Sequence, residues 1–372
     1  MNKNVYFQNT KEDIFKNVFP FFKNVNESQY IDLNKIDKKI MGQILSQIKK
    51  TNNMPFRLNS QELLFLQKNP KEKWMDYLIY RYKFRTFPLD KVVSDFPLYV
   101  LIEPVSTCNL RCTMCFQIDK SFTKKPYMGI MDIEFYKKII DDCFKNGTKA
   151  ITLASRGEPT LHPKLGEMLE YTSNKFYELK LNTNATRLNE KIIHRILKSN
   201  VNELVYSVDE SEKEKFEKLR VNANFEEVLK NIIKFKEIRE KYYKNSKTTT
   251  RISGVLVDED QDIKKITKFW EQYVDHVVFV KCQNRWDTYN NDLDNEISPC
   301  NYLWERMYIW FDGIANPCDV DYKSYLKLGK LDYSKNSIKD LWHSEAYRDI
   351  RNKHLTNKRK NINPCDRCGL TF

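Results

Sequence analysis

The sequence lacks a long hydrophobic run. Its longest apolar stretch, from Phe96 to Ile102, is far too short to cross a bilayer, which takes about 20 apolar residues. The N-terminal residues MNKNVYFQNTKEDIFK contain no apolar segment of the kind that secretory signals carry. We therefore expect a cytoplasmic protein that has no membrane partner.

The sequence also lacks a dense block of basic residues, although its formal net charge is +13. Such a charge can indicate an anionic partner such as nucleic acid, a nucleotide-sugar or an acidic peptide. The lysines are spread along the whole chain, however, which fits a solvated lysine-rich surface better than a phosphate-binding face. We expect no nucleic-acid partner.

The order of apolar and polar residues predicts three parts. Residues 1–97 favour a mostly helical N-terminal extension, with isoleucines at spacings of four or five, and the stretch FPLDKVVSDFP ends it.

From residue 98 to 294, strand-like and helix-like segments alternate six times, which predicts an α/β fold with a parallel sheet. The expected strands are 98–103, 149–155, 178–183, 203–208, 250–257 and 276–281. Six units predict a partial (β/α)6 TIM-like barrel, whose active site lies at the C-terminal ends of the strands. Residues 295–372 are expected to form a separate small domain.

The nine cysteines are clustered, which in a chain of this size without a signal indicates metal or redox chemistry rather than disulfides. Cys108, Cys112 and Cys115 are spaced C-x3-C-x2-C in the loop after the first expected strand. A structural zinc site takes four thiolate or imidazole ligands, whereas this loop offers three. Three ligands leave one metal position open, as in an iron–sulfur cluster that binds a substrate or cofactor at one iron.

With this motif the chain resembles the radical S-adenosylmethionine (radical SAM) enzymes, in which the loop after the first barrel strand carries C-x3-C-x2-C. Later loops agree in order with the same family. Arg156-Gly157-Glu158-Pro159 resembles its Gly-Gly-Glu-Pro turn, Asn182-Thr183-Asn184-Ala185 its asparagine-containing turn, and Ser207-Val208-Asp209 its Ser-Ile-Asp segment.

The resemblance implies a set of cofactor-binding residues. Cys108, Cys112 and Cys115 would bind a [4Fe–4S] cluster, and S-adenosylmethionine (SAM) would contact Met114, Gly157, Glu158, Asn184, Ser207 and Arg220. Two positions depart from the family pattern. Arg156 replaces the first glycine of the turn, and Met114 stands where an aromatic residue often packs on adenine; Gly157 still allows close backbone approach.

A second group of four cysteines provides a complete four-ligand site that suits either zinc or a second cluster. Its members are Cys300, Cys318, Cys365 and Cys368. Gly313 five residues before Cys318, an intervening helix-like segment and the final C-x2-C resemble the auxiliary-cluster domains called SPASM and, in the single-cluster form, twitch. The resemblance implies a second [4Fe–4S] cluster and an electron-transfer protein of the flavodoxin or ferredoxin type as reductant.

The resemblance implies cleavage of SAM to a 5′-deoxyadenosyl radical that abstracts a substrate hydrogen. We expect an oxidoreductase that carries out a two-electron oxidation of a small carbohydrate or aminocyclitol-like alcohol, because the C-terminal cysteine spacing is similar to that of aminocyclitol dehydrogenases. The alternatives are a peptide-modifying maturase, a radical epimerase, and a binding protein whose clusters are structural.

Three residues are candidates for the chemistry on the substrate. Asp319 follows Cys318 and could accept the proton that an oxidised alcohol loses, because carboxylates are ionised at neutral pH. Arg285 lies in the loop after the sixth expected strand and could orient the substrate. Cys282 directly follows that strand, where an epimerase would need a hydrogen-atom donor, although core packing also explains it.

Overall fold

A computed structural model describes residues 20–25, 30–51, 56, 58–282, 285–296 and 298–370. The chain divides into two compact units, one that ends at Asp90 and one that runs from Lys91 onward. Within the described residues no helix is both long enough and apolar enough to cross a membrane. The boundaries expected at 97/98 and 294/295 stay predictions.

The described part of the first unit is helical, as predicted. It contains α2 (Lys35–Thr51), α3 (Ser60–Lys68), a 3-10 turn η2 (Lys71–Lys73) and α4 (Trp74–Asp90). Helix α3 begins at a capping box, in which the Asn59 side chain accepts from the Glu62 amide and the Glu62 carboxylate accepts from the Asn59 amide. The buried Glu62 also pairs with Arg81 and Arg85, so one carboxylate links α3 to α4.

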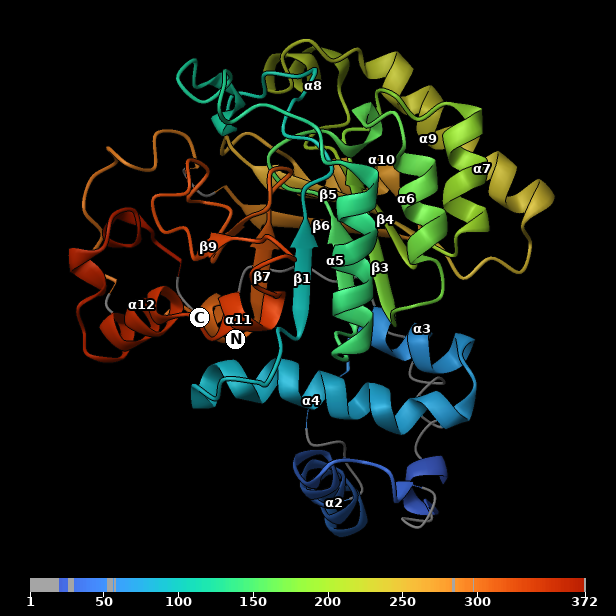
Figure 1. Cartoon of the computed structure of the whole chain (residues 1–372). Coiled ribbons are helices and arrows are strands. Elements are labelled where there is room, and N and C mark those ends of the chain that lie inside the picture. Colours follow the sequence, from blue (N-terminus) through green and yellow to red (C-terminus); the bar gives the residue numbers. More distant parts are fainter. Residues whose placement is uncertain are drawn as a thin grey trace. The chain divides into compact units, whose positions relative to one another are not determined.

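The second unit is built on one sheet of nine strands in the order β6-β5-β4-β3-β2-β1-β7-β8-β9 (Figure 1). Strands β1 to β7 are parallel to one another, whereas β8 pairs antiparallel with β7 and β9 pairs antiparallel with β8. The strands are β1 (Tyr99–Ile102), β2 (Ala150–Leu153), β3 (Glu178–Thr183), β4 (Glu203–Ser207), β5 (Thr249–Leu256), β6 (His276–Lys281), β7 (Arg306–Ile309), β8 (Ile314–Asn316) and β9 (Gly329–Lys330).

The first six strands coincide with the six expected ones to within two residues at either end, which confirms the partial barrel. The sequence did not predict β7. This strand comes from the cysteine-rich C-terminal region and pairs with β1 on the side opposite β2. The C-terminal region therefore continues the barrel sheet, and its loops meet the loops that follow β1 and β2.

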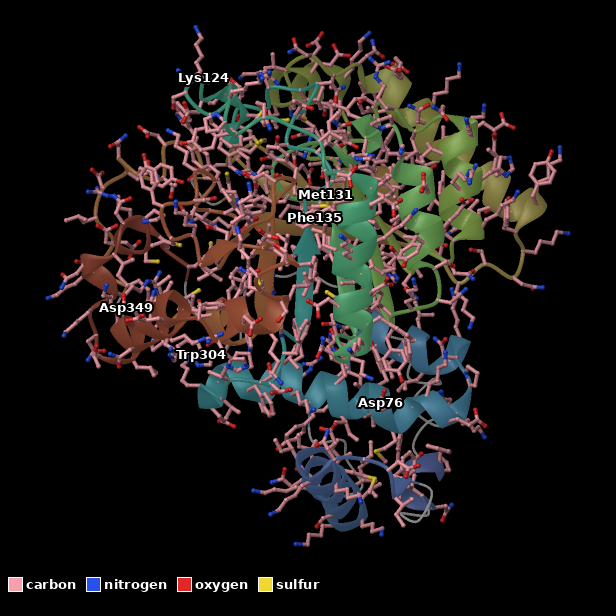
Figure 2. All side chains as sticks on the ribbon, viewed as in Figure 1. Asp76, Lys124, Met131, Phe135, Trp304 and Asp349 are labelled. Atoms are coloured by element: carbon pink, nitrogen blue, oxygen red, sulfur yellow. The ribbon has the colours of Figure 1, made fainter. Side chains whose placement is uncertain are left out.

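Helices cover the outer face of the sheet. They are α5 (Ile133–Lys145), α6 (Leu165–Thr172), α7 (Glu190–Lys198), α8 (Lys213–Leu219), α9 (Phe225–Tyr242) and α10 (Ile263–Trp270). Helix α5 begins where the sequence predicts, because the Asp132 carboxylate accepts from the amides of Glu134 and Phe135. Met131 and Phe135 mark this end of the helix in Figure 2.

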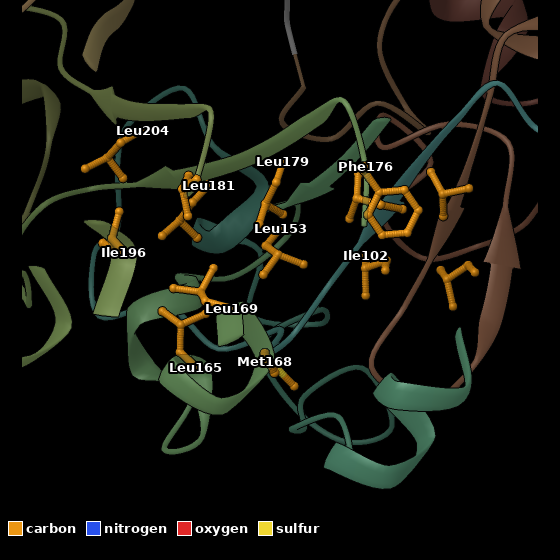
Figure 3. Close-up of a cluster of buried hydrophobic side chains, with 14 of the residues drawn as sticks. Ile102, Leu153, Leu165, Met168, Leu169, Phe176, Leu179, Leu181, Ile196 and Leu204 are labelled. Carbon is orange, nitrogen blue, oxygen red and sulfur yellow. The ribbon is translucent and has the colours of Figure 1, made fainter. Parts of the chain in front are cut away.

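The main core lies between the strands and these helices. Figure 3 shows strand residues such as Ile102, Leu153 and Leu181 among helix residues such as Met168 and Ile196, all of them buried. Burying apolar surface is the main favourable term in folding, at about 25 cal/mol per Å². Cys143 is 0% exposed in the same core, which fits a packing role for its side chain. The packed outer face holds the strands in place, so their C-terminal loops start from a rigid frame.

The remaining elements surround the second cysteine group. They are the 3-10 turn η5 (Asn301–Trp304), the helices α11 (Ile338–Trp342) and α12 (Glu345–Leu355), and the short 3-10 turns η6 (Arg359–Asn361) and η7 (Cys365–Arg367). Two further 3-10 turns, η3 (Phe116–Ile118) and η4 (Pro159–Leu161), lie in the loops after β1 and β2.

Candidate functional site

The first three cysteines lie in the loop after β1. The Leu110 amide donates to Cys108 Sγ at 3.4 Å, Cys112 and Cys115 act electrostatically on Cys108, and Cys112 also acts on Cys115. Burial raises the pKa of Cys108 to about 12 and that of Cys115 to about 11. Thiols in such surroundings ionise when a metal binds them, so this donor set suits a soft, positively charged metal centre.

Gly157 lets the loop after β2 pass directly over the cysteine loop. A Cβ at this position would lie 2.2 Å from the Val105 carbonyl oxygen and 2.5 Å from that of Thr107. The next residue, Glu158, donates its amide to the Thr107 carbonyl at 2.9 Å. The expected need for glycine at 157 therefore arises from the backbone of residues 105–107, just before Cys108.

The Glu158 carboxylate is 3% exposed and joins the loops after β2 and β3. Its Oε1 accepts from the Thr160 amide and from the hydroxyls of Thr160 and Thr183, and its Oε2 accepts from the Asn184 amide at 2.7 Å. Burial raises the pKa of Glu158, and these donors oppose that shift. A carboxylate has about four acceptor positions, so Oε2 retains capacity for one more donor such as an ammonium group.

Asn184 lies against the first cysteine. Its Nδ2 is 3.8 Å from Cys108 Sγ and donates to Asn109 Oδ1 at 3.0 Å, while its Oδ1 accepts from Thr186. Two buried polar atoms nearby in sequence, Ser155 Oγ and Asn182 Oδ1, have no hydrogen-bond partner within the described residues. Buried polar groups without a partner are uncommon, so these atoms fit a site that binds a polar cofactor.

Arg220 lies beside the first cysteine loop, and its contact with SAM stays a prediction. It is the C-cap residue of α8, its Nε lies 2.8 Å from Asp209 Oδ2, and its Nη1 lies 3.9 Å from Cys112 Sγ. Asp209 is 0% exposed and also accepts from the Val255 amide. The Asp209 carboxylate and the Cys112 thiol raise the pKa of Arg220 above its ordinary value, against the effect of burial. Arg220 thus supports the cysteine loop directly.

Met114 and Ser207 occupy the positions that the sequence predicts. Met114 is half-buried between Cys112 and Cys115, and Ser207 is half-buried at the end of β4 opposite Ser253 of β5. Both lie in the loop region at the C-terminal ends of the strands. Their contacts with SAM stay predictions.

The second cysteine group comes together from four separate segments. Cys368 raises the pKa of Cys300, and Cys300 and Cys368 together raise the pKa of Cys318 and of Cys365, in each case in addition to the larger effect of burial. Burial raises the pKa of Cys300 to about 12. Within the described residues no three His, Cys, Asp or Glu side chains approach closely enough to hold a single metal ion. Four thiolates form a ligand set that an iron–sulfur cluster takes.

Arg285 and Asp319 form an ion pair between the two cysteine groups. Arg285 Nη1 lies 2.8 Å from Asp319 Oδ2, and the Tyr308 hydroxyl donates to Asp319 Oδ1 at 3.3 Å. The charge of Arg285 acts on Cys115, and Cys318 acts on Arg285. The Asp319 carboxylate raises the pKa of Arg285 above its ordinary value.

Cys282 is half-buried directly after β6, and its amide donates to the Leu256 carbonyl. Burial raises the pKa of its thiol, with a further contribution from Asp209. The thiol is therefore in its neutral S–H form at neutral pH, which is the form a hydrogen-atom donor requires.

The structure adds a residue that sequence reasoning passed over. Arg156 is 3% exposed and makes two hydrogen bonds to the buried Glu103 at the end of β1, at 2.7 and 2.6 Å. It also donates to the Tyr322 carbonyl at 2.9 Å and lies 4.2 Å from the ring centre of Trp310. The sequence carried one signal for this role, because Arg156 stands where the family pattern has a glycine.

Further contacts join the segment after Cys115 to the segment after Cys318. The Phe116 and Tyr322 rings stack with centroids 4.9 Å apart, and Asp119 accepts from the Tyr322 hydroxyl and pairs with Lys323, each near 2.9 Å. These hydrogen bonds and the Lys323 ion pair hold the pKa of Asp119 far below its ordinary value, although burial opposes them. Together with Arg156 they fix the two cysteine loops relative to each other.

Comparisons with known proteins agree with this geometry. Residues 102–269 match the family model of the radical SAM superfamily, and residues 300–369 match that of an iron–sulfur cluster-binding domain named SPASM.

The chain is also similar to curated proteins. It is 32% identical over 112 residues to the tungsten-containing aldehyde ferredoxin oxidoreductase cofactor-modifying protein of Pyrococcus furiosus, over 30% of each chain. It is 25% identical to the AdoMet-dependent heme synthase of Methanosarcina barkeri over 62% of each chain. It is 32% identical to the subtilosin biosynthesis protein AlbA of Bacillus subtilis over 26% of this chain and 20% of AlbA. The chain thus spans less than two thirds of each of these relatives.

Two solved structures share the fold. SuiB of Streptococcus suis bound to its precursor peptide SuiA is 15% identical, with a TM-score of 0.56, and the likeness covers 94% of this chain and 90% of SuiB. BtrN in complex with AdoMet and 2-DOIA is 17% identical, with a TM-score of 0.50, over 73% of this chain and 93% of BtrN. The chain thus carries a radical SAM domain at residues 102–269, followed by a SPASM iron–sulfur cluster-binding domain at residues 300–369, and these domains bind SAM and [4Fe–4S] clusters.

Proposed function

We propose that this enzyme oxidises a residue of a peptide substrate by two electrons. The observation that carries the proposal is the extent of the fold likeness. SuiB, solved with a precursor peptide, matches 94% of this chain, whereas BtrN matches 73%. The difference, about a fifth of the chain, is as large as the helical first unit.

The sequence relatives support the same choice. AlbA is named for the biosynthesis of subtilosin, an antilisterial bacteriocin. The carbohydrate or aminocyclitol oxidation expected from the cysteine spacing lacks confirmation, and the peptide-modifying alternative has the better support. The helical first unit is then the candidate region for peptide docking.

We assign the cofactor ligands as the sequence predicts. Cys108, Cys112 and Cys115 bind the cluster that contacts SAM, and the C-terminal group binds the auxiliary cluster, with ligands Cys300, Cys318, Cys365 and Cys368. When bound, the first cluster supplies an electron that splits SAM into methionine and a 5′-deoxyadenosyl radical. Glu158 Oε2 is the acceptor proposed for the SAM ammonium.

Asp319 is the proposed base. Asp319 would accept the proton from the substrate's O–H, N–H or S–H group, while the SAM-derived radical would take the neighbouring C–H hydrogen atom and the auxiliary cluster held by the C-terminal cysteines would take the remaining electron. Two electrons and two hydrogens thus leave the substrate. Arg285 stays protonated and orients the Asp319 carboxylate, and the Tyr308 hydroxyl holds its other oxygen.

An aminocyclitol-like alcohol is the second candidate substrate. It is favoured by the likeness to BtrN, which covers 93% of that chain, and by the single set of four C-terminal cysteines. The same base and electron acceptor would serve an alcohol.

The experiment that tests the proposal uses substrate fractions from the source organism grown in deuterated medium. Anaerobically reconstituted enzyme is incubated with SAM, dithionite and either the peptide fraction or the small-molecule fraction. We expect deuterium in 5′-deoxyadenosine with the peptide fraction, and loss of that deuterium after protease treatment. Deuterium transfer from the small-molecule fraction alone contradicts the peptide proposal and supports the alcohol. A product that differs from substrate only in stereochemistry, and that is lost in Cys282→Ala, supports epimerisation instead.

A further inference from the structure

Arg359 is a buried cation in the C-terminal domain. Its side chain comes from the turn η6, and the residue is 1% exposed. The guanidinium donates to the carbonyls of Ser298 at 2.9 Å, Cys365 at 3.2 Å and Leu370 at 3.3 Å, and to that of Cys368. It therefore joins the segment just before Cys300 to the segment that carries the last two cysteines.

Within the described residues, the hydrogen-bond partners of Arg359 are neutral carbonyls. No carboxylate of the residues that the structure describes forms an ion pair with it. A buried charge without a counter-charge destabilises the folded protein. A group of opposite charge close to Arg359 would remove this cost.

The four thiols provide that opposite charge when they bind a cluster. The Arg359 guanidinium donates to the backbone carbonyls of Cys365 and Cys368, so its charge lies beside two of the four ligand residues. A four-iron cluster with four thiolate ligands is an anion, and nearby charge and hydrogen bonds set its reduction potential. A fixed positive charge favours the reduced, more negative state.

Arg351 of α12 shows that burial alone does not explain this arrangement. It is 4% exposed and donates to the carbonyls of Leu303 and Trp342, at 2.9 and 3.0 Å. Its guanidinium lies over the Trp342 and Tyr347 rings, and both carbonyls to which it donates belong to residues other than the four cysteines. Figure 2 labels Trp304 of η5 and Asp349 of α12, the elements that carry Leu303 and Arg351. Arg351 is therefore a matched control.

We propose that Arg359 is a positioning residue that supplies the counter-charge of the auxiliary cluster and raises its reduction potential. The cluster then accepts an electron more readily. The use of that electron in substrate oxidation rests on the function proposed above, whereas the effect on the potential does not.

The test measures the potential without any substrate. In a Cys108→Ala, Cys112→Ala, Cys115→Ala background only the C-terminal cluster remains, so a redox titration followed by electron paramagnetic resonance reports it alone. We expect a lower midpoint potential in Arg359→Gln, a potential close to that of the parent in Arg359→Lys, and no shift in Arg351→Gln. An unchanged potential in Arg359→Gln, or an equal shift in Arg351→Gln, overturns the proposal.

If Arg359→Gln does not retain iron, the rate at which each variant loses iron to a chelator is measured instead of the midpoint potential. Slow loss in Arg359→Lys and fast loss in Arg359→Gln support the role of the charge, because lysine keeps the charge without the planar fork. Equally fast loss in both variants overturns it and leaves Arg359 with a role in hydrogen bonding to the loop carbonyls. Because no substrate is present, failure of the peptide proposal leaves this result unaffected.

Discussion

Arg285 Nη1 lies 2.8 Å from Asp319 Oδ2, so two residues that the sequence presents as rival candidates act as one unit. The pair lies between the two cysteine groups, since Arg285 influences Cys115 and Asp319 influences Cys318. A base in this position can accept a proton from a substrate held between the SAM cluster and the electron acceptor. The arginine and the Tyr308 hydroxyl fix the two carboxylate oxygens.

Asp319→Asn is expected to separate hydrogen abstraction from oxidation. The amide keeps the size of the side chain but cannot accept the proton, and loss of a general base costs about 10²–10⁴ in rate. We expect 5′-deoxyadenosine to form with deuterium from labelled substrate, while oxidised product falls by at least about 100-fold. Mass spectrometry of both products checks this. If oxidation survives in Asp319→Asn but fails in Arg285→Ala, the base has been assigned to the wrong residue.

Arg220→Met is expected to destabilise the folded protein. It leaves Asp209, which is 0% exposed, without its cation, and breaking a buried pair costs about 3–5 kcal/mol. In an Asp209→Asn background the same change should cost about 2 kcal/mol less, because no buried charge is stranded. Urea unfolding of the four proteins gives the two differences. Equal costs in both backgrounds would show that the two side chains are not coupled.

Gly157→Ala is expected to disrupt the first cysteine loop. The added Cβ would lie 2.2 Å from the Val105 carbonyl oxygen, so the backbone before Cys108 must move. Iron should fall from about eight to about four per chain, since only the C-terminal cluster stays intact. Gly42→Ala is the control, because nothing lies within 4 Å of its added Cβ, and alanine favours a helix by about 0.5–1 kcal/mol. A full iron content in Gly157→Ala would show that the loop tolerates a side chain there.

Stability should fall as the pH drops below about 6.5, the ordinary value for histidine. His162 is 4% exposed, one ring nitrogen accepts from the Lys164 amide, and burial lowers the pKa of its imidazole. Below the ordinary value the unfolded chain binds a proton that the folded chain does not, so acid favours unfolding. His162→Gln should weaken this dependence in unfolding experiments at pH 7.5 and 5.5, and His194→Gln should not. An identical pH dependence in wild type and His162→Gln would exclude His162 as its source.

The sequence predicted the barrel strands and the cysteine groups because both depend on local pattern. Alternating apolar segments and ligand spacing can be read directly, so β1 to β6 and the loop positions of Gly157, Glu158 and Asn184 were predicted. The strand β7 was not, because its residues pair with β1 about 200 positions away. The contacts of Arg156 with Glu103 and Tyr322, and of Arg285 with Asp319, were missed for the same reason. Such contacts exist only once the fold brings distant loops together.

The most direct test of the account is the iron content and SAM cleavage of two cysteine variants after anaerobic reconstitution. The wild-type protein should hold about eight irons per chain, and the triple Cys→Ala variant at 108, 112 and 115 about four with no 5′-deoxyadenosine formed. The quadruple Cys→Ala variant at 300, 318, 365 and 368 should also hold about four irons, and it should still cleave SAM when given dithionite. Stoichiometric zinc at the C-terminal group, or 5′-deoxyadenosine from the triple variant, would contradict the assignment of two clusters with SAM at the first.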